Sequence, residues 1–137
     1  MNSGKSHLAT SIAELIAGAV VHMDDCISTG HESVAYVERL DYLKLKQLLS
    51  TAGRGASVVF VDGICLREAL ARIEVVPALF VYVKRMGPNG LWHDGFHLED
   101  YEADQNAVQN EPERSDLHYH SVVRPHERAE FVLHRVE

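Results

Sequence analysis

The first residues that could carry out chemistry form the segment Ser3-Gly4-Lys5-Ser6, near the beginning of the chain. They match the last part of the pattern G-x-x-x-x-G-K-[ST], a loop between a strand and a helix whose backbone amides bind phosphate groups. The first glycine of this pattern would lie two positions before Met1, so the sequence holds half of the loop. In the pattern, the lysine contacts the β and γ phosphates and the last hydroxyl binds Mg²⁺. The alternative is a terminal segment without a role.

Three aspartates follow short apolar runs. Asp24 and Asp25 come directly after AVVHM (19–23), and Asp62 follows SVVFV (57–61). An acid in such a place can accept the proton of a substrate hydroxyl, and carboxylate oxygens are good ligands for Mg²⁺. We therefore expect Asp24 or Asp25 to be catalytic, with the other in the metal shell, and Asp62 to act through the metal. The alternative is that all three are turn residues.

A basic pair, Lys84 and Arg85, follows the apolar run ALFVYV (78–83). Arg85 could move over the phosphates as part of a lid and offset charge that develops in the transition state. A solvated basic pair after a strand is the alternative. In the next loop, His93 and Asp94 could form an acid–base pair. The flanking aromatic residues would anchor the loop or form a wall for a flat substrate.

Histidines form a further cluster in HYHSVVRPH (118–126). On an extended segment, His118 and His120 would face the same way, as metal ligands can. No cysteine or third ligand stands at a recognised spacing, so we interpret His118, His120 and His126 as a surface cluster and not as a zinc site.

The elements that must position these residues alternate between amphipathic helices and valine-rich strands. Asp41 is a predicted N-cap and Gly53 a predicted helix end. Such alternation predicts an open parallel α/β sheet with its ligands at the carboxyl edge, where the half-loop, the acids and the basic pair would meet. The expected helices cover residues 5–17, 42–52, 66–73 and 98–110, and the expected strands cover 19–23, 57–61, 79–83 and 129–137.

Composition limits the class of protein. The 137 residues are 46% hydrophobic, enough for one domain (1–137) with a core. A net charge of −7 argues against a nucleic-acid surface, and no apolar run is long enough to span a membrane. We expect a soluble, cytoplasmic protein in which Cys26 and Cys65 are reduced.

In its motifs the chain resembles the P-loop small-molecule kinases, especially the uridine kinase and nicotinamide riboside kinase group. The segments that carry the resemblance, in order, are NSGKSHLA, VVHMDDC, VVFVDGICL, VYVKRM and VVRPHERAEFVLHRV. The resemblance implies a three-layer P-loop NTPase fold whose first, central strand is missing here, between the strands at 57–61 and 79–83. We therefore expect a truncated gene model, a misplaced start codon or a fragment. The unpaired strand edges would favour self-association.

The resemblance also implies an activity, transfer of the γ-phosphate of ATP with Mg²⁺ to a hydroxyl of a small, nucleoside-like acceptor. The alternatives are a nucleotide-binding domain without transfer activity and an inactive fragment of a longer kinase. Asp24 is the better candidate for the proton acceptor. The implied catalytic residues are Lys5, Asp24, Asp25 and Arg85; the nucleotide-binding residues are Asn2, Ser3, Gly4, Lys5, Ser6, His7 and, near the adenine, Arg124; the metal ligands are Ser6, Asp24 and Asp62.

Overall fold

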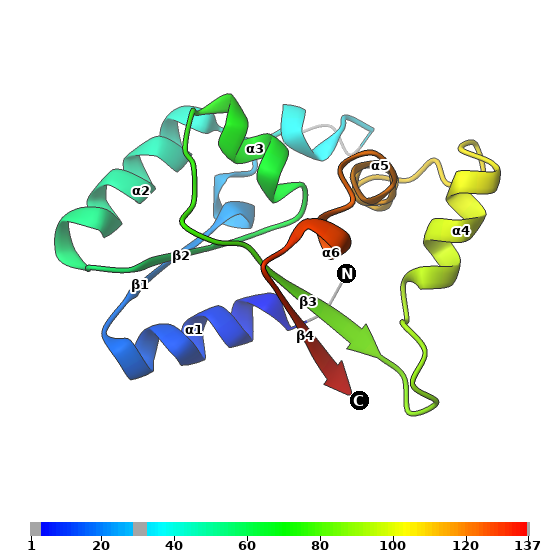
Figure 1. Ribbon diagram of the computed structural model, residues 1–137. Helices are drawn as coiled ribbons and strands as arrows, with labels where there is room; N and C mark the ends of the chain where they lie inside the picture. The colour runs from blue at the N-terminus through cyan, green and yellow to red at the C-terminus, as the bar shows by residue number, and fades with distance from the viewer. Residues whose placement is uncertain (1–3, 29–32, 137) are drawn as a thin grey trace. The chain divides into compact units, whose positions relative to one another are not determined.

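The structure is a computed structural model that describes residues 4–28 and 33–136, so the expected nucleotide-binding residues Asn2 and Ser3 lie outside the described residues. The chain is mixed α/β (Figure 1) and divides into two compact units, which are described separately. The N-terminal unit comprises Lys5–His31 and Tyr36–Val75, and the C-terminal unit comprises Met1–Gly4, Glu32–Ala35 and Val76–Glu137.

The N-terminal unit consists of a parallel strand pair between helices. β1 and β2 pair in register, with Val21 opposite Val61 and His22 opposite Asp62. Helix α1 packs on one side of the pair and α2 on the other (Figure 1). In chain order the elements are α1 (Lys5–Ile16), β1 (Ala19–His22), the 3-10 helices η1 (Met23–Cys26) and η2 (Tyr36–Glu38), α2 (Tyr42–Gly55), β2 (Val59–Asp62) and α3 (Leu66–Arg72).

Local signals explain the helix boundaries in this unit. The side chain of Asp41 accepts a hydrogen bond of 2.9 Å from the backbone N–H of Lys44, which confirms the predicted N-cap. The predicted end at Gly53 is wrong, because α2 continues to Gly55. Glycine weakens a helix but does not prevent helical backbone angles. Leu45 of α2 is completely buried, together with Met23, Cys26, Cys65 and Leu70.

The C-terminal unit contains a second parallel pair. β3 and β4 pair in register from Val81 opposite Phe131 to Met86 opposite Val136. Leu98, Tyr101 and Leu117 form a buried cluster against which Trp92 packs. The helix predicted at 98–110 begins earlier in the structure, at Gly95, and already ends at Ala103. The elements are β3 (Val81–Met86), α4 (Gly95–Ala103), α5 (Glu113–Val123), α6 (Pro125–Arg128) and β4 (Phe131–Val136).

The strands form two sheets of two strands each, so the expectation of one continuous open sheet is not met among the described residues. The expected parallel direction is confirmed in both pairs. Among the described residues, no strand pairs with a strand of the other sheet. Every helix in the described part of the chain is too short or too polar to cross a membrane.

Candidate functional site

The half-loop leads directly into α1. A tight turn at Ala17 and Gly18 joins α1 to β1, and α1 packs along both strands. The helix therefore runs opposite to β1, and its N-terminal end lies toward the edge at which β1 and β2 end (Figure 1). Lys5 and Ser6 are the first two residues of this helix. Ser6 and the predicted nucleotide ligand His7 are exposed, and Lys5 is half-buried.

Asp24 and Asp25 lie in η1, immediately after β1, and both are exposed. The hydroxyl of Tyr36 donates a hydrogen bond of 2.7 Å to Oδ1 of Asp24. Tyr36 is buried, and burial together with this contact raises its pKa, so it remains a donor. Lys44 Nζ donates to the backbone carbonyl of Asp25. One carboxylate oxygen of Asp24 thus has a fixed partner, which sequence reasoning missed.

Asp62 is the last residue of β2, and only 8% of its surface is exposed. His22, its partner in the neighbouring strand, has Nδ1 at 3.0 and 2.9 Å from the two carboxylate oxygens. His22 was not among the predicted site residues. The sequence did hold a signal for His22, because it stands near the end of one apolar run and Asp62 stands at the end of the other.

The fit of Mg²⁺ to this edge is a question of donor chemistry. The described residues contain no group of three or more His, Cys, Asp or Glu side chains that could hold a metal ion. Mg²⁺ usually keeps several water ligands and takes only one or two carboxylates together with phosphate oxygens. The exposed Ser6 hydroxyl and Asp24 carboxylate are donors of this kind. Asp62 is engaged by His22 and would act through water.

The basic pair does not follow its strand but belongs to it. β3 continues to Met86, so the expected strand end at Val83 is wrong and Arg85 is not in a lid segment. Pairing with β4 continues over the same residues. Arg85 Nη2 lies 2.5 and 2.8 Å from the two ring nitrogens of His93. On the opposite face, Lys84 Nζ lies 4.5 Å from the centroid of a Trp92 ring.

Arg124, which the resemblance placed near an adenine, is held by two carboxylates. Its Nε and Nη2 each donate to Glu127 at 2.6 Å, and Nη1 donates to Glu102 at 3.2 Å. The residue adopts a left-handed conformation with φ of +53° between α5 and α6. These contacts give Arg124 a role in joining α6 to α4, whatever else it binds.

The histidine cluster lies on helices, and its interpretation as a surface cluster is wrong for His120 and His126, whose side chains are only 12% and 8% exposed. His118 and His120 belong to α5, where a spacing of two residues directs side chains to different faces. His118 Nδ1 lies 3.1 Å from the hydroxyl of Tyr101. His120 Nδ1 contacts the carbonyl oxygen of Asp116 at 2.7 Å, and its Nε2 lies 2.8 Å from the hydroxyl of Tyr82.

His120 and His126 form a stacked pair with opposite pKa changes. Their ring centroids are 5.8 Å apart at an interplanar angle of 18°, and the His126 side chain is 8% exposed. Burial acts to lower the pKa of His120, but hydrogen bonds and charge from Asp116 outweigh it, so the pKa is raised. Burial and the charge of His120 lower the pKa of His126. The pair therefore favours a single proton, on His120.

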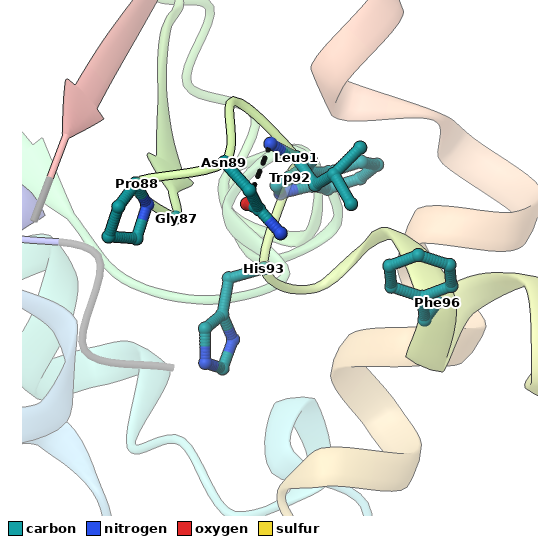
Figure 2. Close-up of a pocket in the computed structure, with 7 residues that line it drawn as sticks. All are labelled: Gly87, Pro88, Asn89, Leu91, Trp92, His93 and Phe96. Carbon is teal, nitrogen blue, oxygen red and sulfur yellow. Dashed lines mark hydrogen bonds between the residues drawn. The ribbon is translucent and has the colours of Figure 1, made fainter.

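An open pocket of about 410 Å³ lies beside the loop that follows β3 (Figure 2). Trp92 and Phe96 both line it, and Trp92 also packs against the buried cluster of this unit. His93 Nδ1 is 3.3 Å from Oδ1 of Asp94, so the expected acid–base pair is in contact. The full lining is Gly87, Pro88, Asn89, Leu91, Trp92, His93 and Phe96.

Comparison with known proteins gives no relative. No family model matches the chain, and no curated protein or solved structure matches it. Its function must therefore be argued from the contacts described above.

Proposed function

We propose that the chain is an ATP-dependent phosphotransferase of the P-loop type, which acts on a hydroxyl of a small, nucleoside-like molecule. One observation carries the proposal: Lys5 and Ser6 at the start of α1 share an edge of the β1–β2 pair with Asp24. A helix N-terminus attracts phosphate, and ligands of parallel α/β sheets bind at the carboxyl ends of the strands.

In this proposal each residue has a defined task. Lys5 binds the β and γ phosphates as a point charge. Asp24 accepts the proton of the acceptor hydroxyl. The hydroxyl oxygen bonds to the γ-phosphorus, and the bond from that phosphorus to the ADP oxygen breaks. Tyr36 holds the Asp24 carboxylate in place. When bound to Ser6 and a carboxylate, Mg²⁺ would neutralise charge on the phosphates.

Calorimetric titration of the full chain with Mg-ATP tests the proposal. Lys5→Ala should weaken ATP binding about tenfold or more, the usual effect of losing a contact between charged groups. Lys46→Ala, which removes an exposed lysine from α2 in the same unit, is the matched control and should bind normally. Equal affinities of both variants and the native chain would refute the phosphate role of Lys5.

Turnover separates the activity from its alternatives. Release of ADP with a nucleoside acceptor, lost in Asp24→Asn while ATP binding is kept, is the expected result. ATP binding without transfer to any hydroxyl would identify a nucleotide-binding domain. A chain that neither binds ATP nor melts cooperatively would be an inactive fragment.

A further inference from the structure

Trp92 connects the pocket to the two stacked histidines of the C-terminal unit. Its side chain lines the pocket from the loop at 87–94 (Figure 2). Its ring centroid lies 4.9 Å from that of His126 and 6.4 Å from that of His120. An indole ring attracts a cation over its face, and Lys84 already lies in that position, 4.5 Å from a ring centroid. A further cation beside this ring would be repelled by the first.

Two polar atoms of this cluster are buried without a hydrogen-bond partner among the described residues. They are Nε1 of Trp92 and Nδ1 of His126. The imidazolium form of histidine carries an N–H on both ring nitrogens. A protonated His126 would therefore have a charged donor at Nδ1 with no acceptor in the part of the chain that the structure describes. Such a buried group is strongly unfavourable, whereas contact with water would satisfy it.

Charges around His126 also oppose its protonation. Its ring stacks on that of His120 with centroids 5.8 Å apart, and Oδ1 of Asp116, 3.4 Å from His120 Nδ1, favours the charged form of that partner. Glu127 lies 3.7 Å from His126 Nε2, but it accepts two hydrogen bonds from Arg124. Burial, followed by the charge of His120, lowers the pKa of His126. The other titratable groups against the pair are Tyr82 and Lys84 of β3, Asp94 of the loop and Tyr119 of α5.

We propose that His126 is a pH switch for the pocket: in acid, the His120–His126 pair takes up a second proton from solvent, its rings separate, and Trp92 and its loop move away from them. With one proton, on His120, the pair keeps the loop closed. Opening admits water to His126 Nδ1 and Trp92 Nε1, which have no partner among the described residues, and this offsets part of the lost packing. Every residue of the switch belongs to the C-terminal unit, so it operates whether or not the chain transfers phosphate.

The test is a fluorescence titration of the full chain from about pH 8 to about pH 4.5, a range that spans the ordinary pKa of histidine. Trp92 is the only tryptophan in the sequence, so no added label is needed. We expect a red shift of the emission and stronger quenching by acrylamide, with a midpoint below about pH 6.5 and unchanged far-UV circular dichroism. His126→Phe should abolish this transition. His97→Phe replaces an exposed histidine of α4 in the same unit and should keep it.

Thermal melts show which variants fold, and His126→Gln provides a second neutral replacement. His120→Gln retains His126 and should move the midpoint to higher pH by about one unit, because it removes the like charge from the stack. A merely structural role of His120 would leave the midpoint unchanged, and this result would refute the coupling. A transition that persists in the His126 variants, one that coincides with loss of far-UV circular dichroism, or a constant fluorescence of the native chain would each overturn the switch.

Discussion

Replacing Asp116 by asparagine should destabilise the chain at acidic pH and have little effect at alkaline pH. In α5, His120 Nδ1 lies 2.7 Å from the Asp116 carbonyl and 3.4 Å from its Oδ1, in surroundings where both side chains are largely buried. At 3.4 Å and an effective dielectric constant of about 20, the Coulomb attraction is about 5 kcal/mol before desolvation. After desolvation, hydrogen bonds to charged groups usually contribute about 1.5 to 3 kcal/mol to the free energy of unfolding.

The sign of the pH dependence follows from the raised pKa of His120. Because the folded pKa lies above the unfolded value of about 6.5, the stabilisation is fully present below about pH 6.5. It is lost as the pH rises through the folded pKa. We therefore expect Asp116→Asn to lower the free energy of unfolding by about 2 kcal/mol at pH 5.5 and much less at pH 9.

Urea unfolding at both pH values measures this difference. Asp100→Asn makes the same chemical change at an exposed position on α4 and should leave the free energy of unfolding nearly unchanged at either pH. An equal loss in Asp116→Asn at pH 5.5 and pH 9 would refute a charged His120 as the cause.

Three further predictions concern packing and titration. Leu45→Ala should lower the free energy of unfolding by about 2 to 5 kcal/mol, because Leu45 is completely buried. In the same denaturant series, Leu43→Ala should cost less than about 1 kcal/mol, because the Leu43 side chain is 69% exposed. Tyr36→Phe should cost about 1 kcal/mol and lower turnover without weakening ATP binding, since it removes the donor to Asp24; unchanged turnover would exclude a positioning role. The lowered pKa of the buried His126 means that the folded chain loses stability as the pH falls below about 6.5, where the unfolded chain takes up a proton more readily. His126→Phe should reduce this loss, and a free energy of unfolding that falls with acid as steeply as in the native chain would contradict the prediction.

Elements with strong local signals were predictable from the sequence. Apolar residues at helical spacing identified α1, and the valine-rich runs identified β1 and β2. The N-cap at Asp41 was predictable because capping depends on the chemistry of a few adjacent residues. The end of β1 was predicted one residue too late, since the strand ends at His22 and Met23 separates it from Asp24.

Contacts between distant segments were not predicted. The pairing of His22 with Asp62 depends on strand register, which joins residues 40 positions apart. The neighbouring positions of Arg85 and Arg135 depend on register in the same way. The α5 residues were misjudged because the polar segment around His118 has weak apolar periodicity, and tertiary contacts with Tyr101 and Tyr82 help to order it.

Because β4 is exposed, the charge of Arg135 bears on the solubility of the chain. All six residues of FVLHRV are exposed, including Phe131, Val132 and Leu133. A short apolar strand without proline or glycine is a typical starting point for cross-β aggregation, and a permanent charge within it acts as a gatekeeper. Arg135 is the only permanently charged residue in β4. Substitutions that retain a cation at this position should therefore yield more soluble protein than those that remove it.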